Sequence, residues 1–399
     1  MRFIKNIFDK GKPLFDKGGK FEKFMPIFET FETLFFVPNE VTPPRGAQIR
    51  DAVDLKRMMM TVIIAMVPAL LFGIWNVGYQ HGLATGQELS FLSQVWIGIL
   101  VTMPIIVVSY GTGLTIEFIF GIRKGHALNE GFLVSGMLIP LVVPPTIPLW
   151  QLVLATAFAV LIGKEIFGGT GMNILNVALT ARAFLYFAYP SQISGDVWTY
   201  LGDNAVIDGV TGGTSLAIAN EASMAGTNVV QALGSANTAL SADFFSFSNL
   251  FLGFIPGSIG ETSTAMSLIG ALILIYTGVG SWKIILSVFG GAYATGLLFN
   301  IIGANEYMLM PAHYHLVIGG LAFGAVFMAT DPVSATQTER GKWIYGILIG
   351  VLTVLIRVFN PAYPEGIMLA ILLMNVFAPL IDFYVVKGNK QRRIQRATV

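Results

Sequence analysis

Residues 208–214 form the segment of this sequence with the clearest capacity for chemistry. They read Asp-Gly-Val-Thr-Gly-Gly-Thr and lie in a long polar interval, 191–248, that contains no Lys or Arg. A threonine hydroxyl in an exposed glycine-rich turn suits a phosphoester, because glycines let a modifying enzyme approach the backbone closely. Short Gly/Thr/Ser runs are also common in ordinary loops, so an unmodified turn is the alternative interpretation.

Four ionisable side chains lie within or at the ends of apolar segments, where charge is costly and usually functional. Arg182 lies in mid-segment, so it must face protein, a water-filled pocket or a bound anion. Asp331 precedes Pro332 at the end of a short apolar segment, which fits an ion ligand at a helix break and equally a helix N-cap. Arg357 and Asp382 lie near segment ends, where snorkelling to the interface is the simpler interpretation.

Two further polar features flank apolar segments. Glu130 could cap the segment that follows it or bind a solute at the rim of the membrane. The run Gly-Gly-Thr-Gly-Met-Asn at 168–173 is expected to open a helix, whose N-terminal N–H groups suit a polar or anionic ligand. The sequence contains no Walker motif, no dinucleotide fingerprint in a βαβ unit and no Ser/His/Asp arrangement, so a nicotinamide dinucleotide is not expected to bind this chain.

The composition predicts the kind of scaffold that must position these residues. The chain is 54% hydrophobic and 12% charged, whereas soluble domains carry about 25% charged residues. It is therefore expected to be an all-α polytopic membrane protein. A net charge of +1 lacks the basic excess that is typical of nucleic-acid-binding proteins. The lack of cysteine excludes disulfides and thiolate-bound iron–sulfur clusters within this chain.

Ten apolar segments are predicted to cross the membrane, because about 20 apolar residues span its hydrocarbon core. The third and eighth are short, and Pro256-Gly257 and Gly260 interrupt the sixth. The predicted spans are 58–77, 95–120, 131–143, 149–163, 173–189, 249–278, 282–302, 316–330, 343–359 and 366–386.

The distribution of Lys and Arg predicts the orientation of these spans. All Lys and Arg between the spans fall on the side of the N-terminal arm, and cytoplasmic loops are the ones enriched in these residues. Both termini are therefore expected in the cytoplasm, and the 191–248 loop is expected on the outer face of a bacterial inner membrane. The opposite loops, which carry no Lys or Arg, are 78–94, 144–148, 191–248, 303–315 and 360–365.

The chain is expected to divide into two membrane halves of opposite orientation. Residues 131–136 (Gly-Phe-Leu-Val-Ser-Gly) and 315–320 (His-Leu-Val-Ile-Gly-Gly) each begin a short span that ends at a proline. Inverted repeats with interrupted helices place an ion or solute path between them at the midplane, although small residues are common in all membrane helices. The expected regions are an amphipathic N-terminal arm, 1–57, that lies on anionic lipid or a partner, a first repeat, 58–189, an outer loop, 190–248, a second repeat, 249–386, and a basic tail, 387–399.

Taken together, these segments resemble the flavin-carrying membrane subunits of the Na+-translocating NADH:quinone reductases (Na+-NQR). Residues 208–214 are similar to that family's Asp-Gly-x-Ser/Thr-Gly-Ala-Thr motif, with Gly213 where the family usually has Ala. The sister family, the corresponding flavin-carrying subunits of the Rnf complexes, shares this motif but usually lacks the long N-terminal arm. The other matching stretches are Ile49–Met58, Gly125–Gly131, Gly163–Asn173, Ala181–Pro190, Gly257–Thr264, Met328–Ala335 and Asn360–Asp382.

The resemblance implies two flavins. FMN would be joined through its phosphate to the hydroxyl of Thr214, and a riboflavin would bind without a covalent bond. A fold similar to urea and ammonium channels is also implied. The residues expected to bind the flavins are Thr214, Asp208, Gly212, Gly213 and Arg182 for FMN, and Asn173 and Asn176 for riboflavin.

The resemblance also implies a Na+ path through this chain. The carboxylates that match the family's Na+-handling residues are Glu130, Asp331 and Asp382. Phe323 and Phe327 match the phenylalanines that narrow the pore. Electrons would enter from other members of a six-subunit complex, one of which binds NADH, and would leave to quinone.

Two other functions are compatible with parts of the sequence. An Rnf-type membrane flavoprotein would serve ferredoxin:NAD+ electron transfer, and the co-purifying electron donor would identify it. A solute channel without a redox role would fit the inverted repeat alone, and it would be colourless.

Overall fold

The structure is a computed structural model of the chain, and the part it describes is entirely helical. The expected all-α class is therefore confirmed for that part. The described residues are 2–15, 19–21, 24, 25, 28, 32, 55–124, 131–202, 204, 206, 207, 209–241, 243–360 and 365–397.

The N-terminal arm contains one amphipathic helix in its described part, α1 (Arg2–Phe15). Phe8 and Phe15 both contact Phe28, with ring centroids 5.6 and 4.7 Å apart. An aromatic cluster of this kind agrees with the expected partly helical arm.

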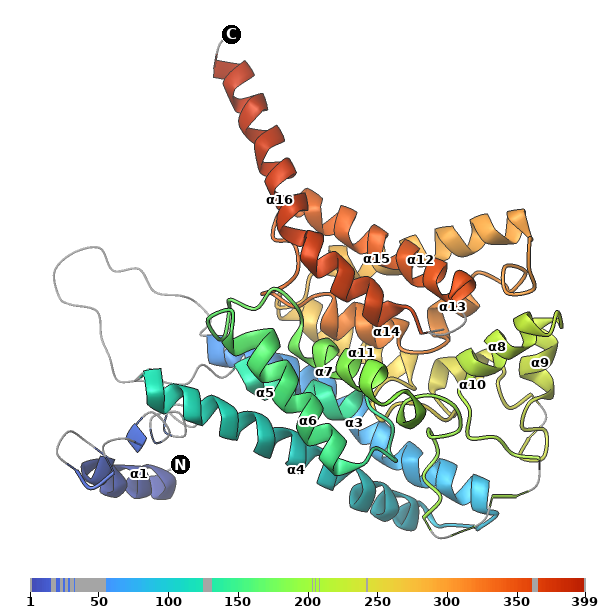
Figure 1. Cartoon of the computed structure of the whole chain (residues 1–399), viewed down its shortest axis with the longest axis horizontal. Coiled ribbons are helices and arrows are strands. Elements are labelled where there is room, and N and C mark those ends of the chain that lie inside the picture. The colour runs from blue at the N-terminus through green and yellow to red at the C-terminus, as the bar shows by residue number, and fades with distance from the viewer. Residues whose placement is uncertain are drawn as a thin grey trace.

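The first half of the membrane region comprises α3 (Leu55–Thr85), α4 (Phe91–Lys124), α5 (Gly131–Leu141), α6 (Leu149–Val160), the π-helix η2 (Leu161–Glu165) and α7 (Val177–Ala188). The long helices α3 and α4 pack against each other and against the short α5, while α6 packs between α4 and α7 (Figure 1). The short α5 packs against the longer α3 and α4, and α7 packs against α6 and α5, so side chains of α5 and α7 form much of the buried core.

The second half comprises α11 (Thr264–Tyr276), α12 (Trp282–Ile302), α13 (Tyr314–Val317), α14 (Leu321–Phe323), the π-helix η4 (Gly324–Met328), α15 (Glu339–Phe359) and α16 (Ile367–Ala397). Here α12 packs along α15, and α15 packs along α16. The two halves meet where α11 contacts α3 and α16 contacts α7. The basic end of α16 projects away from the bundle (Figure 1).

Between the halves lies a smaller region built from η3 (Pro190–Gln192), α8 (Ser215–Met224), α9 (Val229–Ser235) and α10 (Phe247–Leu252). It has its own apolar cluster, in which Leu216, Leu233 and Phe245 pack on Tyr307 and Ile318 of the second half. The predicted loop is therefore folded onto the membrane region, and its position relative to that region is defined.

Five described helices are long and apolar enough to cross a membrane: α3, α4, α12, α15 and α16. Three shorter apolar helices, at 132–141, 177–188 and 264–276, accompany them. Each predicted span contains helix, and the predicted interruption of the sixth span occurs between α10 and α11. The eighth span is more broken than expected, because Gly319 adopts a φ of +67° between α13 and α14.

Candidate functional site

Thr214 is the N-cap residue of α8. Its backbone is extended (φ −77°, ψ 157°) and its Oγ1 accepts a hydrogen bond from the N–H of Ala217 at 3.3 Å. The first N–H groups of a helix have no partner within the helix and favour a negative charge. A phosphate attached to this hydroxyl would therefore lie at the N-terminus of a ten-residue helix.

The turn before Thr214 is held by side chains rather than by regular structure. Asn237 accepts from the N–H of Thr211 at 2.8 Å and donates to its carbonyl at 3.1 Å. The Thr211 hydroxyl donates to Asp196 at 2.6 Å and accepts from the N–H of Gly213 at 3.1 Å. These contacts fix the direction in which the following hydroxyl points.

Gly212 and Gly213 differ in the space around them. A methyl group on Gly212 would approach the carbonyl oxygen of Asp196 to 2.6 Å, which the backbone cannot accommodate without moving. A methyl group on Gly213 would meet only side-chain oxygens, of Thr211 at 3.2 Å and of Asp196 at 3.4 Å. An alanine at 212 would therefore displace the backbone, whereas an alanine at 213 requires only a small shift of two side chains.

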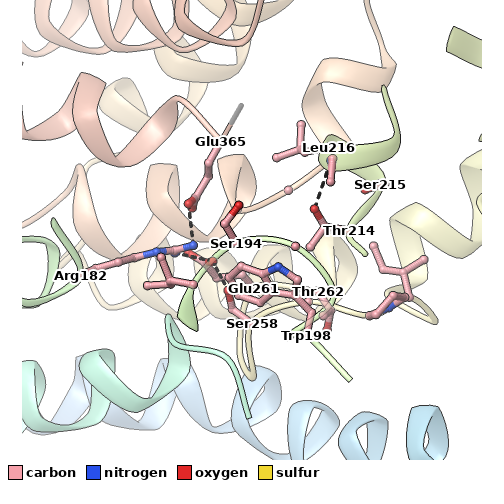
Figure 2. A pocket seen from close by; sticks show the side chains of 18 of the residues that line it. Arg182, Ser194, Trp198, Thr214, Ser215, Leu216, Ser258, Glu261, Thr262 and Glu365 are labelled. Carbon is pink, nitrogen blue, oxygen red and sulfur yellow. Dashed lines mark hydrogen bonds and ion pairs between the residues drawn. The ribbon is translucent and has the colours of Figure 1, made fainter. Parts of the chain in front are cut away.

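Thr214 opens onto a cavity, here called cavity 1, that is also lined by Arg182, Glu261, Gly319 and Glu365. Its volume is about 100 Å³, below the roughly 300–1,000 Å³ typical of small-molecule and cofactor sites, and it is open to solvent on one side. Figure 2 shows Thr214 and the charged residues on facing sides of this cavity.

The charged residues of cavity 1 form one buried cluster. Arg182, which is 4% exposed, donates to Glu261 Oε2 at 2.7 Å and lies 2.5 Å from Glu365 Oε2. Glu261 also accepts from the hydroxyl of Ser258 at 2.7 Å. Arg182 thus faces both protein and a cavity, as its place in mid-segment predicted.

Glu261 and Glu365 were missed by the sequence reasoning. A signal was available for Glu261, because a carboxylate inside an interrupted apolar segment is costly unless it is paired. No comparable signal marks Glu365, which lies in a proline-rich loop far from Arg182 in the sequence.

Arg357 corrects an expectation. Its place near the end of a span suggested a snorkelling side chain, but it is 1% exposed and donates to three main-chain carbonyls, of Glu365, His315 and Ile318. Arg357 points inward because these carbonyls belong to breaks in helices and need donors.

A second cavity, here called cavity 2, is lined by Lys164, Asn173, Asn176, Phe327 and Asp331, among others. Its volume is about 60 Å³. The two asparagines expected at riboflavin and the aspartate expected on the Na+ path thus share one cavity. Sequence reasoning had treated them as separate sites.

Asp331 is held in cavity 2 by neutral groups. It accepts from the N–H of Val333 at 3.0 Å, the hydroxyl of Ser334 at 2.9 Å and the amide of Asn176 at 3.3 Å. Asn176 is also the N-cap of α7, where it accepts from the N–H of Leu179. The helix therefore begins at Val177, not at the glycine run 168–173, and this is a second correction.

Lys164 forms a buried ion pair with Glu117 of α4, and both side chains are 4% exposed. Sequence reasoning had counted Lys164 among the charges of a loop. Lys164 and Asp331 are the charged residues that line cavity 2. Glu117 offsets the charge of Lys164, whereas Asp331 forms no ion pair with a described residue.

Phe323 and Phe327 lie in the segment that joins the lining of cavity 1 to that of cavity 2. Their ring centroids are 4.8 Å apart, and the side chains are buried, at 0% and 3% exposed. Gly319 and Gly320 line cavity 1, whereas Phe327 and Asp331 line cavity 2.

Asp382 lines neither cavity. Its carboxylate accepts from the N–H of Gln337 at 2.8 Å and from the N–H and hydroxyl of Thr338 at 3.0 and 2.6 Å. It thereby holds the turn that leads from Asp331 to α15. Glu130 and Asp208 lie outside the described residues, and so do the predictions made for them.

Residues 44–391 match the NQR2, RnfD, RnfE family. A protein from Chromohalobacter salexigens, named as a Na(+)-translocating NADH-quinone reductase subunit (the one designated B), is 48% identical over 417 residues, which cover 98% of this chain and 96% of that protein. Proteins of the same name from Klebsiella pneumoniae and Ectopseudomonas mendocina are each 46% identical and cover 98% of this chain and 99% of their own length.

Proposed function

This chain belongs to the NQR2, RnfD, RnfE family, and from that premise we propose that it is the membrane flavoprotein subunit of a Na+-translocating NADH:quinone reductase. Its relatives of that name match over nearly their whole length, N-terminal arm included. This full-length match favours the Na+-NQR subunit over its Rnf counterpart. The complex would comprise six subunits, with NADH bound to another one and quinone as the electron acceptor.

Covalent FMN on Thr214 is the core of the proposal. The single observation that carries it is the position of this hydroxyl, at the N-terminus of α8 and at the wall of cavity 1. The helix terminus suits the phosphate, and cavity 1, lined by aromatic, charged and small residues, lies directly beside it. A flavin bound there would supply the capacity to accept and pass on electrons.

In-gel fluorescence of the denatured, purified chain tests this proposal. A covalent flavin stays with the chain in denaturing detergent, so the band should fluoresce. A band without fluorescence from a chain that carries bound flavin before denaturation would refute the covalent link. A colourless native chain would instead indicate a solute channel.

We propose that Arg182 positions two walls of cavity 1 and does not bind the FMN phosphate directly. Its guanidinium is shared by Glu261 and Glu365, so an anion would have to compete with two carboxylates. We assign it to positioning these two walls of the cavity around the flavin ring. Gly212 and Gly213 shape the attachment turn, and Asp208 belongs to the same motif.

Cavity 2 is proposed to take the noncovalent riboflavin and to lie on the Na+ route. The amides of Asn173 and Asn176 can donate to and accept from a flavin ring, and Asp331 supplies an oxygen ligand for a hard cation. Phe323 and Phe327 would form the constriction between the cavities. Asp382 would act through the turn that follows Asp331, and Glu130 completes the proposed set of carboxylates.

The inverted repeat is proposed on the packing of the two halves. In the first half α4 contacts α6 and α6 contacts α7, and in the second α12 contacts α15 and α15 contacts α16. The contacts between the halves, α3 with α11 and α7 with α16, join elements in corresponding positions. This arrangement supports ten spans and a channel-like path at the interface.

The outer loop is proposed to face the periplasm, with both termini in the cytoplasm. Met224, which is 72% exposed at the end of α8, is a suitable reporter, whereas Ala219 is fully buried. Because the chain lacks cysteine, the thiol of a Met224→Cys variant is the only one in the chain that a maleimide can label. It should react with an impermeant maleimide in intact cells, and labelling only after lysis would reverse the topology.

A further inference from the structure

Arg357 is a buried charge to which the proposed flavin chemistry assigns no role. Its Nε donates to the carbonyl of Glu365 at 3.0 Å, and its Nη1 and Nη2 donate to those of His315 and Ile318 at 2.6 and 2.8 Å. Within the described part of the chain it forms no ion pair. An arginine with carbonyl partners alone keeps its full positive charge in a region of low dielectric.

The three carbonyls belong to two breaks that form walls of cavity 1. His315 and Ile318 end the short helix α13, directly before Gly319, and Glu365 precedes α16. A methyl group added to Gly319 would lie 3.5 Å from Arg357 Nη2, so the guanidinium is directly behind this wall. The planar fork of arginine can serve both turns at once.

The charge of Arg357 adds to that of the cavity. The ionisable side chains that line cavity 1 are Arg182 and the two carboxylic residues Glu261 and Glu365. Arg357 adds a second positive charge directly behind the wall. Removal of Arg357 would therefore make the surroundings of the cavity more negative.

We infer that Arg357 is a positioning residue of cavity 1, which ties the Gly319 turn to the Glu365 turn and whose charge raises the midpoint potential of the flavin held there. The inference rests on the proposed flavin on Thr214. A flavin held there would accept one electron from a reduced donor centre of a partner protein in the complex. No bond would form or break and no proton would be required, so the cavity would gain one negative charge, which Arg357 would stabilise.

Redox titration of the covalent flavin in the purified complex tests this role. Arg357→Gln removes the charge and should shift the one-electron equilibrium about tenfold toward the oxidised form, which corresponds to about 59 mV. Arg357→Lys keeps the charge but loses the planar guanidinium that bonds both turns. Its midpoint potential should therefore stay close to that of the wild type, while its thermal stability should fall. Arg340→Gln removes an exposed arginine from the same helix and is the matched control.

Glu365→Gln provides a test of opposite sign that remains valid if Arg357→Gln fails to accumulate. It removes a negative charge from cavity 1 and should raise the midpoint. An unchanged midpoint in Arg357→Gln, an equal shift in Arg340→Gln, or a lower midpoint in Glu365→Gln would overturn the inference. A wild-type chain without a fluorescent denatured band would instead refute the flavin site itself.

Discussion

Cavities 1 and 2 lie at opposite ends of the interrupted segment formed by α13, α14 and η4, yet they handle charge differently. Cavity 1 contains a closed cluster in which Arg182 is shared by two carboxylates. Cavity 2 contains Asp331, whose partners are amide, hydroxyl and backbone N–H groups. A closed cluster suits a ligand that stays in place, whereas an aspartate with neutral partners can attract a cation that arrives and leaves.

The contrast extends to how each ligand would be held. In cavity 1 the proposed attachment point is one hydroxyl, which follows a turn held by Asn237 and Asp196. In cavity 2 the polar groups come from two different segments, around Asn176 and around Asp331. Substitutions should therefore affect cofactor content at the first cavity and ion dependence at the second.

The largest effect is expected from Thr214→Ala, which should abolish the covalent flavin. The acceptor hydroxyl is lost, and the lost N-cap of α8 costs only about 1 kcal/mol, so the chain should still insert. In-gel fluorescence measures the covalent flavin, and a blot of the membrane fraction measures the inserted chain. Thr227→Ala removes another hydroxyl from the outer loop and should leave the band fluorescent; fluorescence that survives in Thr214→Ala would move the attachment site elsewhere.

The glycine pair should give the next largest effect. Gly212→Ala forces a clash with the Asp196 carbonyl, and overpacking of this kind costs about 1–3 kcal/mol, enough to lower covalent flavin content about tenfold. Gly213→Ala meets only side chains that can shift, and its flavin content should stay within about twofold of wild type. Equal fluorescence in the two variants would show that the geometry of the turn does not control attachment.

Asp331→Asn should raise the Na+ concentration for half-maximal quinone reduction roughly five- to tenfold. The variant loses the charge that attracts Na+, while the asparagine oxygen can still accept from the N–H of Val333 and its amide N–H can donate to the Ser334 hydroxyl. Covalent flavin content should not change, since that residue lies in the other cavity. Steady-state rates titrated with NaCl decide the matter: an unchanged Na+ dependence in an assembled complex would leave Asp331 with a local structural role.

Asp382→Asn should have the smallest effect, a loss of about 1 kcal/mol in stability and a Na+ shift smaller than that of Asp331→Asn. Its carboxylate contacts Gln337 and Thr338 rather than either cavity. Thermal unfolding and the same NaCl titration provide the measurements. A Na+ shift larger than that of Asp331→Asn would place the main cation ligand at Asp382 instead.

The helical class could be predicted from the sequence because it depends on local patterns. Apolar runs of membrane length identify α3, α4, α12, α15 and α16 whatever their neighbours are. The sequence also indicates Thr214 as a candidate through a glycine-rich turn of a few residues, and the structure adds that α8 begins directly after it.

The tertiary structure alone decided which charges meet. Arg182 pairs with Glu261 and Glu365, which are far away along the chain, and nothing local to Arg182 indicates either partner. Arg357 was expected at the interface because its distance along the helix allowed snorkelling, but the unsatisfied carbonyls of two broken helices turn it inward. In a membrane, a charge or an open carbonyl must find its partner inside the protein, so these pairings depend on how distant segments pack and not on the sequence around each residue.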